Sequence, residues 1–111
     1  MASKSANYCW ASPEQPKGVL ILSEVALGQT LKVTEARDMD FTTAQSMHGL
    51  GRMSRRKDTH EVLLNSGIQV PIGAPEPVPL ESALLYNEYV VYAPEQQRIR
   101  YLVLVHFDFL T

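Results

Sequence analysis

The alternation of apolar and polar positions predicts that β-strands dominate this chain. The clearest case is RIRYLVLVHFDF at residues 98–109, because consecutive side chains of an extended segment point to opposite faces. One face then holds Ile99, Tyr101, Val103, Val105, Phe107 and Phe109. The other face holds Arg98, Arg100, Leu102, Leu104, His106 and Asp108. We therefore predict a long strand near the C-terminus.

Four further stretches are predicted to contain strands. The near-continuous apolar run VLILSEVAL at 19–27, which lies between two glycines, is typical of a strand buried on both faces. The segment 31–36 predicts a short strand, and 61–73 predicts another with Asn65-Ser66-Gly67 as its turn. The segment LLYNEYVVY at 84–92 predicts a core-like strand.

The N-terminal segment predicts a short helix. SKSANYCWA, residues 3–11, contains neither Pro nor Gly and begins with Ser3, which is a suitable N-cap residue. Helical spacing places Ser5 and Tyr8 on one face of this helix.

Glycine and proline mark the segments that are predicted to be irregular. HGLG at 48–51 is turn-prone, and 38–45 predicts a turn or a half-turn of helix. The loop 73–82 contains three prolines that oppose regular ladder bonding, namely Pro75, Pro77 and Pro79. The pattern as a whole indicates a strand-dominated fold with one short helix.

Composition narrows the class of protein. The chain has 111 residues, enough for one domain with a modest core. Its formal net charge of -2 predicts no general attraction to nucleic acid or anionic lipid. It lacks an apolar run of the roughly 20 residues that a membrane helix needs, and no secretory signal precedes Cys9, so we expect an intracellular protein without a membrane partner. One cysteine and three scattered histidines show no zinc spacing, so we expect no metal.

Glu88 is the clearest candidate for chemistry. An extended segment 84–92 places this carboxylate on one face with aromatic and apolar side chains, which are Leu84, Tyr86, Val90 and Tyr92. Burial of an unpartnered carboxylate is costly. Glu88 therefore either meets solvent or an arginine such as Arg98 or Arg100, or it is a cleft carboxylate aimed at a ligand hydroxyl.

Three other groups have both a structural and a functional interpretation. Ser5 and Tyr8 suit a flat heteroaromatic ligand, through a hydrogen bond and ring stacking; the alternative is that Tyr8 and Trp10 form a packing stripe of the helix. His48 is either a turn residue or a base. Four basic residues fall within six positions, namely Arg52, Arg55, Arg56 and Lys57. They belong either to a solvated loop or to a phosphate-binding patch.

Several segments resemble, in order, the C-terminal half of the catalytic domain of poly(ADP-ribose) polymerases. They are SKSANYC, GVLILSEVALG, HGLG, VPIG and LLYNEYVVY followed by RIRYLVLVHFDF, and together they extend over nearly the whole chain. SKSANYC and LLYNEYVVY are the most specific of them. The resemblance implies an α+β fold, the strand-dominated mixed or antiparallel split sheet of the ADP-ribosyltransferase fold. Residues 1–111 would form an incomplete, C-terminal part of that domain.

The resemblance also implies an activity and roles for single residues. The family transfers ADP-ribose from NAD to protein side chains or to a growing polymer and releases nicotinamide. By their places in the motifs, Ser5 would hydrogen-bond the nicotinamide carboxamide and Tyr8 would stack on the nicotinamide ring. Glu88 would be the catalytic glutamate, which bonds the 2'-hydroxyl of the nicotinamide ribose and orients or activates the acceptor hydroxyl. Lys4 and Tyr86 match positions on the acceptor side.

The family's NAD site also uses a His-Gly pair and a first Tyr upstream of the SKSANYC motif. These would precede Met1, and His48 belongs to a different motif, so we expect the isolated chain to be an impaired transferase. The alternatives are a non-catalytic interaction fragment and a truncated gene model. Expected partners are NAD as donor substrate, acceptor proteins and ADP-ribose polymer, without a DNA-binding module in this chain. A nuclear location and a part in DNA repair are implied by the resemblance alone.

Overall fold

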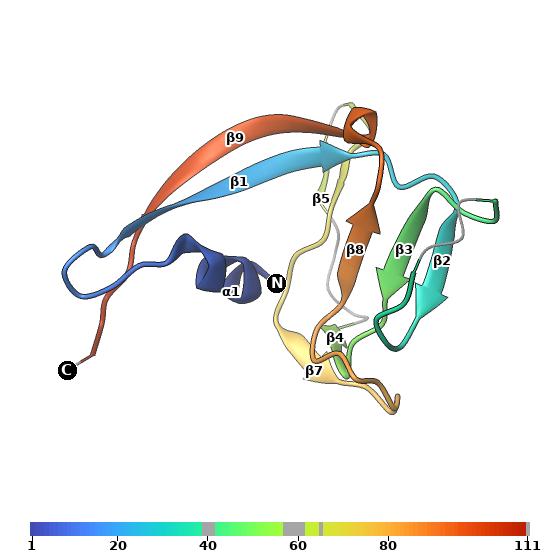
Figure 1. Ribbon diagram of the computed structural model, residues 1–111, viewed down its shortest axis with the longest axis horizontal. Helices are drawn as coiled ribbons and strands as arrows, with labels where there is room; N and C mark the ends of the chain where they lie inside the picture. Colours follow the sequence, from blue (N-terminus) through green and yellow to red (C-terminus); the bar gives the residue numbers. More distant parts are fainter. Residues whose placement is uncertain (39–41, 57–61, 65, 111) are drawn as a thin grey trace. The chain divides into compact units, whose positions relative to one another are not determined.

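The chain folds into two units that are both built around β-strands (Figure 1). The computed structural model describes residues 1–38, 42–56, 62–64 and 66–110. Unit 1 consists of Met1–Ala26 and the C-terminal segment that begins at Glu95, and unit 2 consists of Leu27–Pro94. The described residues form nine strands in several small sheets and one α-helix, which confirms the prediction of a strand-dominated α+β fold with split sheets.

Unit 1 combines a short helix with a long antiparallel ribbon. Helix α1 (Ala2–Ala6) continues into a 3-10 turn, η1 (Asn7–Cys9), and strand β1 (Lys17–Val25) pairs with β9 (Gln97–His106). The predicted helix is present, but it begins one residue earlier and its α-helical part is shorter than predicted. Ser3 therefore lies inside the helix and does not cap it.

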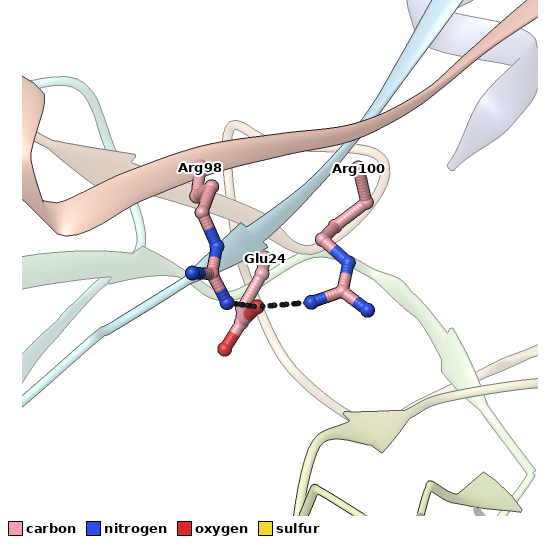
Figure 2. A network of polar contacts seen from close by, with 3 residues as sticks. All are labelled: Glu24, Arg98 and Arg100. Atoms are coloured by element: carbon pink, nitrogen blue, oxygen red, sulfur yellow. Dashed lines mark hydrogen bonds and ion pairs between the residues drawn. The ribbon is translucent and has the colours of Figure 1, made fainter.

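Polar contacts close the end of the ribbon next to the 3-10 turn η2 (Pro94–Gln96). The backbone N–H of Ala26 donates to the Gln96 carbonyl at 2.7 Å, and the Gln96 side-chain amide donates back to the Ala26 carbonyl at 3.1 Å. Leu22 of β1 pairs with Tyr101, and the next residue, Ser23, pairs with Ile99. Arg100 is therefore one extra residue in β9. Arg98 and Arg100 both reach the carboxylate of Glu24, at 3.0 and 3.1 Å (Figure 2).

The apolar side chains of the ribbon are largely exposed within the described structure. Three large side chains of β1 are more than half exposed, namely Val19, Ile21 and Leu22. The prediction that β1 is buried on both faces is therefore wrong, because in the described residues β1 has one strand neighbour and a short helix to cover it. The predicted alternation in β9 is confirmed near its end, where half-buried Val103 and Val105 alternate with exposed Leu102 and Leu104.

Gly18 allows the helical segment to approach the ribbon closely. A Cβ atom at this position would lie 2.7 Å from the Cβ and 2.9 Å from the Sγ of Cys9, and 3.1 Å from the Phe107 ring. The Cys9 thiol also lies 3.5 Å from the Val19 carbonyl, to which it donates. The glycine thus leaves room for a cysteine and an aromatic ring on the same side of β1.

Unit 2 is built around a mixed three-stranded sheet. Strand β3 (Ser46–Gly49) lies between β2 (Thr30–Val33), to which it is parallel, and β8 (Glu88–Val91), to which it is antiparallel (Figure 1). Two shorter antiparallel pairs accompany this sheet. They are β4 (Met53–Arg55) with β7 (Pro75–Pro77), and β5 (Val62–Leu63) with β6 (Gln69–Val70).

The core of unit 2 is small and lies against β2 and β3. Ala44 and Met47 are buried and pack against Leu31 and Val33. Ser46 is fully buried, and its hydroxyl shares a 3.0 Å hydrogen bond with the hydroxyl of Thr30 on the neighbouring strand. The buried hydroxyl therefore has the partner that its burial requires.

Two segments predicted to be irregular are partly strands. His48 and Gly49 of the HGLG motif belong to β3, where Gly49 serves a close approach and not a turn: a Cβ there would lie 2.5 Å from Leu84 Cδ1. The proline-rich loop contributes β7, a three-residue strand with prolines at both ends and Glu76 between them. Proline is tolerated there because strand ends need fewer ladder bonds.

The remaining predictions for unit 2 agree with the structure in part. A strand in segment 31–36 is confirmed as β2, and segment 61–73 contains a hairpin in which Gly67 has a φ of 81° and its N–H bonds the Leu64 carbonyl. The predicted turn residue Asn65, and residues 39–41 of the predicted turn 38–45, lie outside the described residues. In the part of the chain that is described, no helix has the length and apolar character to cross a membrane.

Candidate active site

Ser5 and Tyr8 line one open pocket in unit 1. The pocket has a volume of about 310 Å³, and its wall also includes Cys9 and the β1 residues 19–21. The α-helical and 3-10 turns together place the Ser5 and Tyr8 side chains beside the same space, as the spacing predicted. Tyr8 is 73% exposed and Trp10 is 89% exposed, so the two rings do not form a packing stripe within the described part of unit 1.

Lys4 precedes Ser5 on the same short helix. It is half-buried, and its backbone N–H donates to the Met1 carbonyl at 3.1 Å. Ser5 makes the equivalent contact to Met1 at 3.3 Å. The first helical turn therefore fixes the backbone of both residues next to the pocket.

Glu88 is the first residue of β8 and lies directly opposite Gly49 of β3. It is half-buried. A Cβ atom at Gly49 would lie 3.8 Å from the Glu88 Cβ and 3.7 Å from its carbonyl oxygen, so the glycine leaves space beside the carboxylate side chain. Arg98 and Arg100, which the sequence offers as partners of Glu88, bond Glu24 within unit 1 (Figure 2).

The segment before Glu88 is not part of a long strand. We predicted a strand over 84–92, but β8 spans Glu88–Val91 only. The backbone N–H groups of Arg52 and Met53 donate instead to the carbonyls of Leu84 and Leu85, at 3.0 and 2.7 Å. Tyr86 forms a single parallel bridge with Met53. Residues 84–87 are therefore held by the 51–54 segment and not by β3.

Asn87 joins these two segments through its side chain, a role that was not predicted from the sequence. Its Oδ1 accepts from the Gly51 N–H at 2.8 Å, and its Nδ2 donates to the Ser54 hydroxyl at 3.2 Å. Gly51 is buried, and a Cβ there would lie 2.3 Å from the backbone carbonyl carbon of Tyr86. The one available signal was an amide side chain within an otherwise apolar and aromatic segment. Asn87 thus fixes the backbone immediately before Glu88.

Ser82 provides a second polar junction close to this segment. Its hydroxyl lies 2.9 Å from the Thr34 carbonyl and 2.6 Å from the Leu50 carbonyl, and it accepts from the Leu84 N–H at 3.0 Å. A hydroxyl has one hydrogen, so it donates to one of the two carbonyls at a time. Ser82 therefore links the end of β2, the HGLG segment and the chain that leads to Glu88.

His48 faces away from Glu88. It pairs with Tyr89, the residue after Glu88, so the two side chains lie on the opposite face of the sheet. The His48 and Tyr89 rings stack with their centroids 4.2 Å apart. Burial, together with the charge of nearby Lys32, lowers the pKa of His48, and its Nε2 has no hydrogen-bond partner among the described residues. The interpretation of His48 as a turn residue is wrong, and its position does not favour a role as base beside Glu88.

Acidification is expected to destabilise unit 2 through His48. The pKa of His48 in the folded chain lies below the usual 6.5. As the pH falls toward 6.5, the unfolded chain therefore takes up a proton at this histidine before the folded chain does. The stabilising contribution is complete above the unfolded pKa and is lost as pH falls toward the folded pKa. His48→Phe, which keeps a ring against Tyr89, is expected to reduce the loss of thermal stability between about pH 7.5 and about pH 5.5, measured by circular dichroism.

His106→Phe provides the control for this measurement, because His106 is an exposed histidine on β9 of unit 1. The control should keep the pH dependence of the unaltered chain. An identical pH dependence in His48→Phe and the unaltered chain would rule out His48 as the titrating group.

The structure places the candidate residues in two groups. Lys4, Ser5 and Tyr8 belong to unit 1, where Ser5 and Tyr8 share a pocket. Tyr86 and Glu88 belong to unit 2, on either side of Asn87. Each group combines side chains that suit ligand binding: a hydroxyl and an aromatic ring in the first, and a phenol and a carboxylate in the second.

The short helix and the split sheets are consistent with part of an α+β ADP-ribosyltransferase fold. A family model described as "Poly(ADP-ribose) polymerase catalytic domain" matches residues 1–107. The chain belongs to this family.

Individual relatives are also named as poly(ADP-ribose) polymerases. The chain is 46% identical over 117 residues to human "Poly [ADP-ribose] polymerase 2", a match that covers 99% of this chain and 20% of the relative. It is 40% identical over 114 residues to "Poly [ADP-ribose] polymerase 2-A" of Oryza sativa subsp. japonica, covering 98% and 17%. It is 37% identical over 113 residues to "Poly [ADP-ribose] polymerase" of Drosophila melanogaster, covering 98% and 11%. The chain thus spans a fifth or less of the length of these relatives.

Proposed function

We propose that this chain supplies the catalytic glutamate and part of the nicotinamide site of an NAD-dependent, poly-ADP-ribosylating protein transferase. The transferase moves ADP-ribose from NAD to protein side chains or to a growing polymer and releases nicotinamide. The observation that carries the proposal is the pocket shared by Ser5 and Tyr8. A hydroxyl and an exposed aromatic ring beside one open space suit a planar ring that bears a carboxamide.

In this proposal the unit 1 residues hold the leaving group. The Ser5 hydroxyl hydrogen-bonds the carboxamide of nicotinamide, and the Tyr8 ring stacks on the pyridinium face. Tyr8 is available for stacking because the residue is 73% exposed. When the bond between the ribose C1' and the nicotinamide nitrogen breaks, the electron pair stays on nicotinamide, which departs neutral.

By its place in the family's motif, Glu88 is the residue that acts on the ribose of NAD. Cleavage of a glycosidic bond passes through an oxocarbenium-like state, and a nearby carboxylate stabilises the positive charge that develops. Glu88 also bonds the ribose 2'-hydroxyl and orients the acceptor hydroxyl, whose oxygen forms the new bond to C1' while its proton is released. By their places in the family's motifs, Lys4 and Tyr86 are assigned to the acceptor side. The contacts of Asn87 support this role, because they fix the backbone next to the carboxylate.

The proposal also includes the domain to which the chain belongs, its partners and its location in the cell. Residues 1–111 form the C-terminal part of the catalytic domain, and acceptor proteins and ADP-ribose polymer are the partners. Nuclear location and DNA repair are proposed from the family alone. We further propose that the 111 residues by themselves bind NAD weakly, because the motifs they contain do not include the family's His-Gly pair and first Tyr.

A chimeric protein tests this function. The segment of human poly(ADP-ribose) polymerase 2 that aligns with this chain is replaced by the chain itself, and automodification with labelled NAD is measured. We expect activity in the chimera and none above background in the isolated chain. Tyr8→Ala in the chimera is expected to raise the KM for NAD at least about fivefold, since a ring stack is worth roughly 1 kcal/mol beyond its buried area.

Trp10→Ala is the matched control, because Trp10 is also aromatic and exposed but does not line the pocket. It should leave the KM unchanged. The proposal fails if a folded chimera, verified by circular dichroism, consumes no NAD, or if the two substitutions raise the KM equally.

A further inference from the structure

The backbone that carries Glu88 is held by different neighbours on its two sides. Strand β8 begins at Glu88, which lies opposite Gly49 of β3. The preceding residues 84–86 are held instead by the segment 52–53, through backbone hydrogen bonds and a parallel bridge. Asn87 is therefore the residue at which the chain passes from one neighbour to the other.

The Asn87 side chain closes this junction with both of its polar atoms. Its Oδ1 accepts from the backbone N–H of Gly51 at 2.8 Å, and its Nδ2 donates to the Ser54 hydroxyl at 3.2 Å. An amide offers an acceptor and a donor on one carbon, which matches the donor and the acceptor of this single segment. Because Gly51 is buried, its N–H depends on a partner within the protein. The side chain of Asn87 is that partner.

The support to which Asn87 is bonded is itself part of a strand pair. Ser54 is the middle residue of β4, and it pairs with Glu76 of β7. Of the basic cluster in this region, Arg55 ends the same strand, whereas Lys57 lies outside the described residues. Asn87 thus joins the backbone of the catalytic segment to a paired strand and not to an unpaired loop.

We propose that Asn87 is a positioning residue for the Glu88 carboxylate, with the Gly51 N–H and the Ser54 hydroxyl as its anchors. This proposal rests on the function proposed above and adds a residue to it. Both polar atoms of the amide are directed at the segment 51–54, so Asn87 acts on Glu88 through the backbone that they share. A displacement of about 1 Å in a catalytic group costs about 100-fold in rate, so the loss of this anchor should affect the chemical step.

Steady-state kinetics of the chimeric protein with labelled NAD test this inference. Asn87→Ala removes both hydrogen bonds and is expected to lower kcat by about 10- to 100-fold, with little change in the KM for NAD. Ser54→Ala removes one of the two bonds and keeps the bond to the buried Gly51 N–H. It should lower kcat by a smaller factor than Asn87→Ala does.

The Glu88→Gln background separates positioning from a general loss of structure. If Asn87 acts through the Glu88 carboxylate, Asn87→Ala has little further effect on the residual activity once that carboxylate is replaced. A general loss of folded protein would instead lower the activity by the same factor in both backgrounds.

Thr30→Val is the matched control for lost stability. It removes the 3.0 Å hydrogen bond to the buried Ser46 hydroxyl, within the same three-stranded sheet. Ser46 pairs with Val91, at the other end of β8 from Glu88, so this bond lies about 10 Å along the strands from the Glu88 pair. The substitution should lower stability and leave kcat unchanged.

Hydrogen exchange in the 111-residue chain, without NAD, tests the contact independently of catalysis. The Gly51 amide is expected to exchange about tenfold faster in Asn87→Ala than in Thr30→Val, because only the first variant removes its acceptor. The inference is overturned if Gly51 exchanges alike in the two variants, or if Asn87→Ala leaves kcat unchanged or lowers activity equally in both backgrounds. Failure of the transferase function is distinguishable, because it abolishes activity in the unaltered chimera and leaves the exchange at Gly51 unaffected.

Discussion

Replacing Glu88 by Gln in the chimeric protein is expected to lower the rate of ADP-ribose transfer by about 100- to 1000-fold. Glutamine has nearly the same size and can still hydrogen-bond a ribose hydroxyl, so the KM for NAD should change little. What is lost is the negative charge that stabilises the oxocarbenium-like state, and such a loss lowers kcat and kcat/KM together. Incorporation of labelled ADP-ribose at several NAD concentrations separates the two parameters.

Glu95→Gln is the control for this change. Glu95 is an exposed carboxylate of η2, and the substitution makes the same change from a charged carboxylate to a neutral amide. It should leave kcat and KM unaltered. Equal losses for the two variants would show that net charge matters and that the position of Glu88 does not. A rise in KM with unchanged kcat for Glu88→Gln would assign the residue to substrate binding and not to the chemical step.

The position of Glu88 depends both on a local sequence pattern and on contacts with residues that are distant in the sequence. That β8 contains Glu88 was predictable, since the apolar and aromatic pattern is local. The limits of that strand were not predictable, because Leu84 and Leu85 bond Arg52 and Met53, which are more than 30 positions earlier. The same holds for Asn87, whose two partners have no visible relation to it in the sequence. Side-chain junctions of this kind require the tertiary structure.

Burial was harder to predict than extended structure. The period of two in residues 98–109 correctly indicated β9, and the apolar run after Gly18 correctly indicated β1. Whether such a strand is covered depends on its neighbours, and the described residues of unit 1 provide one partner strand and a short helix. A continuous apolar run therefore indicated a strand but not its environment.

Glycine in the HGLG motif was misread for a related reason. Glycine occurs both where φ is positive and where two backbones approach closely, and the sequence does not distinguish these uses. Gly49 lies in a strand and makes room for Leu84, whereas Gly67 has a φ of 81° in a turn. By contrast, the Ser5 and Tyr8 part of the candidate site was predictable, because two residues one helical turn apart need only local structure.

Replacing Gly51 by Ala is expected to destabilise unit 2 strongly, by about 3 kcal/mol. The new Cβ would lie 2.3 Å from the carbonyl carbon and 2.5 Å from the Cα of Tyr86, and 2.7 Å from the nitrogen of Asn87. These are backbone atoms, so no side-chain rotation relieves the clash. The segment 51–54 must separate from 84–87, which also breaks the 2.8 Å bond from the Gly51 N–H to Asn87.

Thermal unfolding followed by circular dichroism measures this loss, and a decrease in Tm of roughly 10 °C or more is expected. Gly67→Ala is the control that separates crowding from backbone strain: Gly67 has a positive φ, but nothing lies within 4 Å of its added Cβ. It should cost only about 1 kcal/mol. If Gly67→Ala destabilises the chain as much as Gly51→Ala, close approach of the two segments does not determine stability. If instead the Gly51 variant alone is strongly destabilised, the contact that holds the backbone before Glu88 is also a principal contributor to the stability of unit 2.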